Sequence, residues 1–276
     1  MEERGKDRLL AMGNLVFFVL MLIINGLANT IKIGGRTTGE VSEAIPNLFV
    51  PSGITFAIWG LIYLLLSVFT IYYQGRIFFN SDNKLHELLR RMGPFYLLSS
   101  IFNILWLLTW HYFLIILSLP IMLCLLVSLV AIYLRLGIGK LKRNLIQKLI
   151  LELPFSIYLG WITVATIANV TAVFVYLGWD RFGLAEEMWA VLMMAVATAI
   201  ALLVLFLRRD LAFATVVAWA FWGIWLKRNH PGTVFVPSVA YSALIGLGII
   251  FLGLIATIIG LIIRRKKEGG LVDENG

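Results

Sequence analysis

The sequence predicts an all-α membrane protein, a polytopic bundle of about eight transmembrane helices. Of its 276 residues, 61% are hydrophobic and only 14% are charged, and the mean hydropathy is +0.93. Soluble domains carry about 25% charged residues. A helix needs about 20 mostly apolar residues to cross the hydrocarbon core of a bilayer, and the chain has several such runs between short charged stretches.

Eight apolar segments are expected to cross the bilayer, at 10–31, 53–73, 95–112, 114–136, 148–175, 187–207, 211–227 and 236–263. The stretch from Phe95 to Tyr133 is too long for one crossing, so its most polar point, Trp110-His111-Tyr112, predicts a tight turn. The first residues, MEERGKDR, lead into apolar sequence without a small-residue cleavage site. We therefore expect the first span to be retained.

Positive charge is distributed unevenly between the loops. With the N-terminus placed in the cytoplasm, 18 of the 23 Lys and Arg residues fall on the inner side. Cytoplasmic loops carry such an excess because positive charge is hard to translocate. We expect both termini in the cytoplasm and a location in the plasma membrane of a prokaryote. This distribution also accounts for the net charge of +8, so the bilayer is the expected partner and nucleic acid is not. The single cysteine, Cys124, cannot form an internal disulfide.

The longest outer segment, residues 32–52, reads KIGGRTTGEVSEAIPNLFVPS. Its apolar residues Leu48, Phe49 and Val50 are unusual for an exposed loop. The segment is either a cap that folds back over the helix bundle or an ordinary connector, and the sequence leaves both open.

Aromatic and amide side chains recur at helical spacing inside the predicted spans. In the third span Asn103, Trp106 and Trp110 fall on one helical face at i, i+3 and i+7. In the fifth span Trp161, Ala165 and Asn169 follow at i, i+4 and i+8. Trp59 and Tyr63 lie one turn apart in the second span, and Asn25 and Asn29 in the first.

Amide groups that face lipid have no hydrogen-bond partner, which costs several kcal/mol, so these stripes should face the interior. The pattern predicts a chamber in the outer half of the bundle, suited to a flat, largely apolar ligand. The alternative is that the amides bridge helices and the rings fill a solid core. Three other tryptophans fit the interfacial belt: Trp179, Trp189 and Trp225.

The same residues resemble the TspO/MBR family, the tryptophan-rich sensory proteins related to the translocator protein and peripheral benzodiazepine receptor. The second span has a proline-led start followed by WGLIY, and the third contains NILW. The fifth has Pro154, then Trp161 with Asn169 eight residues later. The resemblance covers roughly residues 10–178 and differs in having Pro51-Ser52 where the family usually has two prolines.

The resemblance implies two parts: a five-helix transmembrane unit at 1–178, and a three-helix extension with a basic cytoplasmic tail at 179–276. It implies a pocket closed by the first loop, with porphyrins, haem-like tetrapyrroles or sterol-like hydrophobes as ligands and no required cofactor. A homodimer is left open. The expected ligand-binding residues are Trp59, Tyr63, Asn103, Trp106, Trp110, Trp161 and Asn169, with Phe49 and Pro51 in the lid.

Charged residues inside or beside the spans support two further interpretations. Asp210 is expected to cap the seventh span, and Glu152 to pair with Lys148 near the interface; either could instead couple protons in a secondary transporter. His111 is expected to be a hydrogen-bonding surface residue, with haem ligation as the alternative. We therefore predict a binding or sensory membrane protein. A transporter of a small hydrophobic solute and a light-dependent porphyrin-degrading enzyme remain alternatives, and no general acid–base pair or metal-ligand spacing is evident in the sequence.

Overall fold

The computed structural model describes residues 2–79, 82–230 and 235–273, and it confirms a polytopic helical bundle. Within these ranges every regular element is a helix. The long helices are α1 (Glu2–Thr30), α3 (Ile58–Phe69), α5 (Phe95–His111), α6 (Ile115–Arg135), α8 (Leu153–Tyr176), α9 (Glu186–Arg208), α10 (Leu211–Arg228) and α11 (Pro237–Asp273). The short helices include α2 (Thr38–Glu43), α4 (Asn83–Met92) and α7 (Leu145–Gln147).

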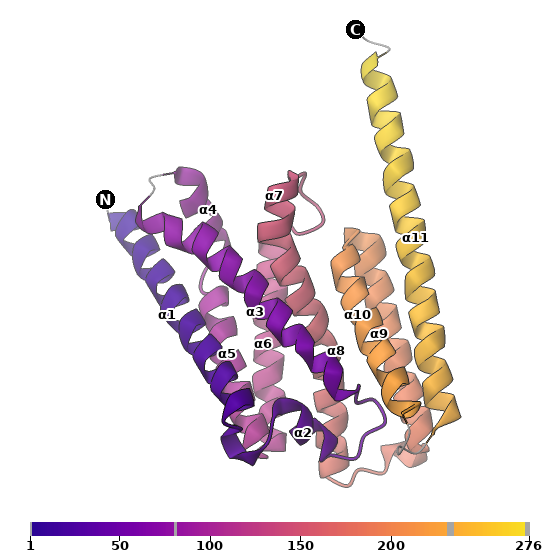
Figure 1. Cartoon of the computed structure of the whole chain (residues 1–276). Helices are drawn as coiled ribbons and strands as arrows, with labels where there is room; N and C mark the ends of the chain where they lie inside the picture. Colours follow the sequence, from indigo (N-terminus) through magenta and orange to yellow (C-terminus); the bar gives the residue numbers. More distant parts are fainter. Residues whose placement is uncertain (1, 80–81, 231–234, 274–276) are drawn as a thin grey trace.

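The helices follow one another across the molecule (Figure 1). Helix α1 packs on α5, α5 on α6, and α6 on α8, while α3 crosses this group and packs on α8. Helix α10 then packs on α8 and is flanked by α9 and α11. A one-turn helix, η2 (Gly53–Ala57), leads into α3, so the second span begins close to its predicted start.

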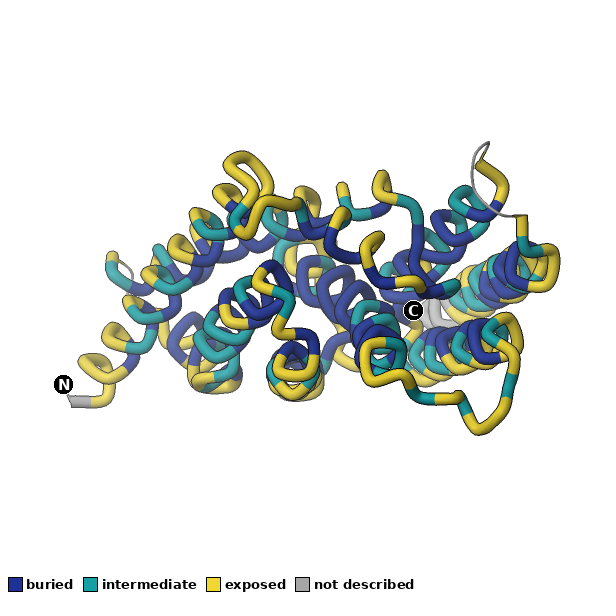
Figure 2. Tube along the Cα trace, turned by 90° about the horizontal axis from the view of Figure 1, so that it is seen from below, coloured by how far each residue is buried: buried dark blue, intermediate teal, exposed yellow. Residues whose placement is uncertain are grey.

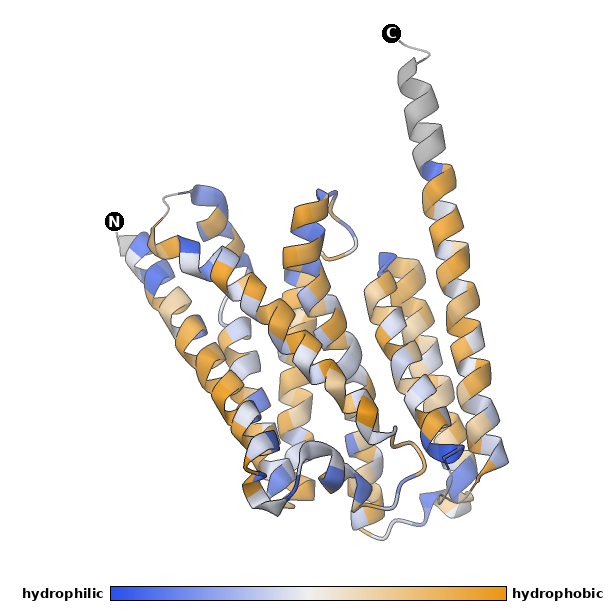
Figure 3. Ribbon diagram, in the orientation of Figure 1, coloured by the Kyte–Doolittle hydropathy of each residue, from blue (hydrophilic) through white to orange (hydrophobic). Residues whose placement is uncertain are grey.

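The outer faces of the helices are apolar, as lipid contact requires. Figure 2 shows buried residues turned toward the interior and exposed residues around the outside. Large hydrophobic side chains are prominent among the exposed ones, including Leu64, Ile71 and Val127. Hydrophobic residues cover the helices along most of their length, and hydrophilic residues gather near their ends (Figure 3). Such extensive apolar exposure marks a surface that meets lipid.

Within the described residues, six helices are long and apolar enough to cross a membrane by themselves. They are α1, α3 with its flanking turns, α6, α8 with its preceding turns, α9 and α11. Helix α5 has 17 residues and passes the same test only together with α4, to which it is bent by 48°. Helix α10 is not among the six, although it lies in the same bundle as the others (Figure 1).

Helix α4 is not among the elements that the sequence predicts. This amphipathic helix links the second and third predicted spans, and its buried face is anchored to α1 by an ionic cluster. Asp7 accepts from His86 Nδ1 at 2.8 Å and from Arg90 Nη1 at 3.0 Å. The predicted turn at Trp110-His111-Tyr112 is present, because α5 ends at His111 and α6 begins at Ile115.

The segments expected on opposite sides of the bilayer do lie at opposite ends of the bundle. The N-terminus, α4, α7 and the turn between α9 and α10 share one end, and α2 lies at the other (Figure 1). Arg208 Nη1 donates to the Ile138 carbonyl at 3.3 Å at the first end, and Arg228 Nη2 donates to the Asn47 carbonyl at 3.1 Å at the second.

Helix α10 holds the start of α3 in place. The Ser52 amide donates to the Gly223 carbonyl at 2.9 Å, and Trp219 Nε1 donates to the Thr55 carbonyl at 3.1 Å. The close contact between α10 and the start of α3 depends on Gly223, because a Cβ there would lie 2.1 Å from Thr55 Cγ2 and 3.1 Å from Pro51 Cβ. Helix α10 therefore contacts the segment that leads into α3, which carries Trp59, one of the predicted ligand-binding residues.

We expect Gly223→Ala to lower the free energy of unfolding by about 1–3 kcal/mol, because the added methyl group overpacks a buried contact. Thermal unfolding of the purified protein in detergent measures the effect. The matched control is Gly248→Ala in α11, where a Cβ meets nothing within 4 Å. Equal melting temperatures for the two variants would contradict this account of the contact.

Candidate ligand-binding site

A cavity bordered by aromatic rings lies between α2, α3, α5 and α8. We call it the aromatic cavity; the space open to the centre of a water molecule is about 40 Å³. It is narrow, since one water needs roughly 10–15 Å³ by this measure. Its walls are Ser42, Ile45, Asn47, Val50, Pro51, Phe56, Trp59, Trp106, Trp110, Trp161, Val164, Ala165, Ala168, Asn169 and Ala172.

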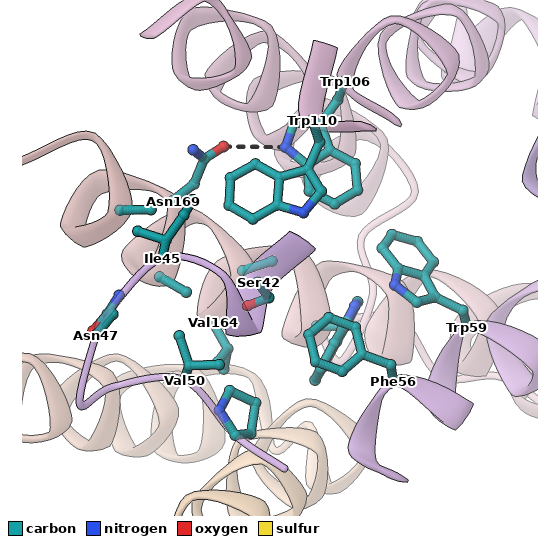
Figure 4. Close-up of a pocket in the computed structure, with 15 residues that line it drawn as sticks. Ser42, Ile45, Asn47, Val50, Phe56, Trp59, Trp106, Trp110, Val164 and Asn169 are labelled. Carbon is teal, nitrogen blue, oxygen red and sulfur yellow. Dashed lines mark hydrogen bonds between the residues drawn. The ribbon is translucent and has the colours of Figure 1, made fainter. Parts of the chain in front are cut away.

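Trp59 is the centre of the aromatic wall. Its ring centroid lies 6.1 Å from that of Trp106 and 6.3 Å from that of Trp161, and it stacks on Tyr63 at 5.5 Å. Trp106 in turn stacks on Trp110 at 5.8 Å. Figure 4 shows Trp106 and Trp110 on one side of the cavity and Trp59 with Phe56 on another. These centroid separations are those at which aromatic pairs attract each other.

Helix α8 contributes the stripe that the sequence predicted. Trp161, Ala165 and Asn169, spaced by four residues, all line the aromatic cavity. Ala168 and Ala172 extend the same face, and their small side chains leave space where larger residues would fill it. Asn169 also fixes a ring: its Oδ1 accepts from Trp106 Nε1 at 3.1 Å (Figure 4), and its Nδ2 donates to Ser118 Oγ at 2.9 Å.

Two of the predicted ligand-binding residues, Tyr63 and Asn103, lie outside the walls of the aromatic cavity. They belong to a hydrogen-bonded network that joins four helices. Tyr63 Oη donates to Asn25 Oδ1 at 2.6 Å, and Asn25 Nδ2 donates to Asn103 Oδ1 at 2.8 Å. Asn103 Nδ2 donates to Tyr158 Oη at 2.9 Å. Asn103 is fully buried, and its amide group forms hydrogen bonds with Asn25 and Tyr158 and not with a ligand in the aromatic cavity.

Tyr63 faces a separate and wider groove between α1, α2 and α3. By the measure that gives 40 Å³ for the aromatic cavity, the space in this groove is about 620 Å³. Asn25 and Asn29, the other predicted amide pair, also line this groove. Phe56 and Trp59 line both spaces, so these two rings form the wall between the groove and the aromatic cavity.

Residues 32–52, the cover segment, lie over the aromatic cavity rather than connecting spans through solvent. The Thr37 side chain and Glu40 form a capping box at the start of α2. Lys32 Nζ lies 2.8 Å from Glu40 Oε1, and together with the Thr37 amide it holds the pKa of that carboxyl below its usual range. Of the two predicted lid residues, Pro51 lines the cavity, whereas Phe49 is fully buried and outside its walls.

His111 fastens the cover segment to α5, and the expectation of a surface histidine is wrong because its side chain is buried. Its Nδ1 lies 2.8 Å from the Ile33 carbonyl, which only accepts, so Nδ1 carries the proton. Its Nε2 then accepts from Thr38 Oγ1 at 3.0 Å. Because both ring nitrogens are occupied, this arrangement leaves no lone pair for a haem iron.

The two acidic residues considered for proton coupling have structural partners. Asp210 caps α10, as predicted, by accepting from the Phe213 amide at 3.1 Å, and it also accepts from Tyr133 Oη at 2.8 Å. Glu152 pairs with Arg143, and not with Lys148 as expected. The reason is that a π-helical turn, η5 (Lys148–Glu152), replaces the α-helical spacing on which the predicted pair depended.

A family model described as TSPO-like protein matches residues 10–256, which include every wall of the aromatic cavity. The chain belongs to the TSPO-like protein family. It is therefore an integral, multi-pass membrane protein of this family, in agreement with the resemblance carried by its Trp and Asn motifs. The match extends over α9, α10 and most of α11. The comparisons with curated proteins and with solved structures give no match.

We expect Asn103→Leu in this TSPO-like protein to lower the free energy of unfolding by about 1–3 kcal/mol for each polar group left without a partner. Tyr158 Oη loses the amide that donates to it, whereas Asn25 Nδ2 keeps its bond to the Met21 carbonyl at 2.9 Å. Thermal unfolding in detergent is the measurement. Asn29→Leu is the control, because exposed Asn29 donates only to the Asn25 carbonyl; the same loss in both variants would argue against the network.

Proposed function

We propose that this TSPO-like protein is a membrane binding or sensory protein that holds a flat, hydrophobic ligand in the aromatic cavity. The supporting observation is the group of four tryptophans, Trp59, Trp106, Trp110 and Trp161, that line one cavity. Indole faces stack on planar apolar molecules, and polar groups at the edge of such a cavity orient them. Porphyrins, haem-like tetrapyrroles and sterol-like molecules are the ligand classes that the family relationship favours.

The narrowness of the aromatic cavity bears on how a ligand enters. Pockets that bind small molecules and cofactors typically measure about 300–1,000 Å³, which is far more than the aromatic cavity offers. Ser42, Ile45, Val50 and Pro51 form the side contributed by the cover segment. We infer that this segment moves outward when the ligand binds, while α3, α5 and α8 keep their positions.

The charge distribution favours placing the aromatic cavity on the outer side of the membrane. The cavity lies at the end of the bundle that holds the cover segment, and the sequence assigns 18 of the 23 basic residues to the opposite end. Under the positive-inside rule both termini then face the cytoplasm. A plasma membrane location in a prokaryote remains part of this proposal.

No observation favours the transporter. Glu152 forms an ion pair with Arg143, and Asp210 caps α10. The light-dependent enzyme stays an open prediction, which a comparison of porphyrin products in light and darkness decides.

We expect Trp59→Leu to weaken the binding of protoporphyrin IX about tenfold, equivalent to about 1.4 kcal/mol, because it removes the central stacking surface. Binding is measured from the shift of the porphyrin absorbance band, so that the loss of an indole is not counted as a loss of quenching. Trp222→Leu, which removes a half-buried indole outside the cavity walls, is the matched control. The proposal fails if protoporphyrin does not bind or if both variants bind like the wild type.

We expect Gly34→Ala to raise both the association and the dissociation rate of the porphyrin, by loosening the cover segment. A Cβ at Gly34 would lie 2.5 Å from the His111 carbonyl oxygen, so the segment could not dock as it does. Gly35→Ala is the control, since Gly35 shares a positive φ but has nothing within 4 Å of the added carbon. Stopped-flow absorbance measures both rates; unchanged rates in Gly34→Ala would contradict a moving cover.

A further inference from the structure

A further pocket lies at the end of the bundle opposite the aromatic cavity, where α3 ends near α4 and α7 (Figure 1). Its space is about 330 Å³, by the measure that gives 40 Å³ for the aromatic cavity. Both π-helical turns that the structure describes, η3 (Thr70–Gln74) and η5, border it, and such turns are frequent at functional sites. We call it the basic pocket, and its walls include Tyr73, Arg76, Lys84, Asn144, Ile146 and Gln147.

The basic pocket has more positive than negative charge in its walls. Arg76, Lys84 and Arg143 line it, and Arg143 is paired with Glu152. No carboxylate whose position the structure describes lies within ion-pair distance of Arg76 or Lys84. Asp82 is an acid in the same wall, and it caps α4 by accepting from the Lys84 amide at 2.9 Å. With both acids counted, the formal charge remains positive.

The neutral polar groups of the basic pocket present donors. Asn144 Oδ1 accepts from the Gln147 amide at 2.8 Å, and Gln147 Oε1 accepts from the Asn144 amide at 3.3 Å. Because this capping box uses both side-chain oxygens, the NH₂ groups remain, and they only donate. Tyr73 is 9% exposed, and its hydroxyl has no hydrogen-bond partner among the described residues. The charges of Arg76 and Arg143 both act on this hydroxyl, so the two guanidinium groups lie near it.

Exposed apolar side chains adjoin the charged wall, which favours a lipid as the occupant over a free phosphate. Ile146 lines the basic pocket and is 57% exposed, and Phe79, three residues after Arg76, is 95% exposed. Arg76 Cζ lies 5.0 Å from the centroid of the Tyr72 ring, which also lines the pocket. Tyrosine and arginine beside exposed apolar residues are typical of the level at which lipid headgroups lie.

We propose that the basic pocket binds the headgroup phosphate of an anionic membrane lipid. Arg76 and Lys84 supply the positive charge, since charge-assisted hydrogen bonds to phosphate are strong. Asn144, Gln147 and Tyr73 donate to the remaining phosphate oxygens. Basic pockets between transmembrane helices on the cytoplasmic side bind anionic headgroups, and the sequence assigns 18 of the 23 Lys and Arg residues to this end. The site is separate from the aromatic cavity and does not depend on the proposed function.

The test measures lipid binding to the delipidated full-length protein in detergent by native mass spectrometry. The probes are dioleoyl phosphatidylglycerol and dioleoyl phosphatidylcholine, which share their acyl chains and phosphate, but only the first has a net negative charge. We expect phosphatidylglycerol to bind at least about tenfold more tightly. Arg76→Gln and Lys84→Gln should each weaken its binding about fivefold, as expected for one basic residue, and change binding of phosphatidylcholine less than about twofold.

Arg91→Gln is the matched control, because Arg91 is an exposed cation of the same helix α4 that pairs with Glu87 and lies outside the walls of the basic pocket. It should leave the ratio of the two lipid affinities unchanged. Tyr73→Phe removes one hydroxyl and keeps the ring, so it should weaken binding of phosphatidylglycerol by a smaller factor. It serves as a further variant if Arg76→Gln does not fold, which thermal unfolding reveals.

Three results would overturn the proposal. The first is equal binding of the two lipids by the wild type, and the second is a preference that survives in both Arg76→Gln and Lys84→Gln. The third is an equal loss in Arg91→Gln, which would mean that any cation at this end suffices. Glycerol 1-phosphate tests for a free phosphate: if it displaces phosphatidylglycerol at comparable concentration, the occupant is a soluble phosphate and the lipid is excluded. Each of these results leaves porphyrin binding, and with it the proposed function, unaffected.

Discussion

A polar group within the bilayer is costly unless it is paired inside the protein, and this constraint organises the bundle. The chain meets it with the network of Tyr63, Asn25, Asn103 and Tyr158, which ties α1, α3, α5 and α8 together. Because these side chains are hydrogen-bonded to one another across four helices, the helices are held in one rotational setting. That setting turns Trp59, Trp106 and Trp161 toward the same space, so the aromatic cavity is a consequence of hydrogen bonds that lie beside it.

The stripes in the third and fifth spans could be predicted because helical spacing and the cost of exposing an amide to lipid are local properties of the sequence. They correctly grouped Trp106 with Trp110 and Trp161 with Asn169. Whether a buried amide faces a cavity or another side chain depends on how neighbouring helices are rotated, which no local pattern contains. For this reason Asn103 and Tyr63 were predicted as ligand-binding residues, although the protein uses their polar groups itself.

Other parts of the site depend on contacts between residues far apart in the chain. Asn47 and Ser42 reach the cavity because the cover segment folds back over it, and in the sequence only the apolar residues at 48–50 indicate this. The buried state of His111 follows from its bonds to Ile33 and Thr38, more than 70 positions away. Glu152 pairs with Arg143 and not with Lys148, because a π-helical turn replaces the α-helical spacing between Lys148 and Glu152. Such turns have no clear signature in the sequence.

The contact between α10 and the start of α3 has a consequence for how the chain can be divided. The Ser52 amide and the Thr55 carbonyl are satisfied by Gly223 and Trp219, which belong to the last third of the sequence. A chain cut after α8 would leave both backbone groups without these partners, beside the segment that carries Trp59. The start of the second span is thus held by backbone contacts with residues more than 160 positions later in the chain.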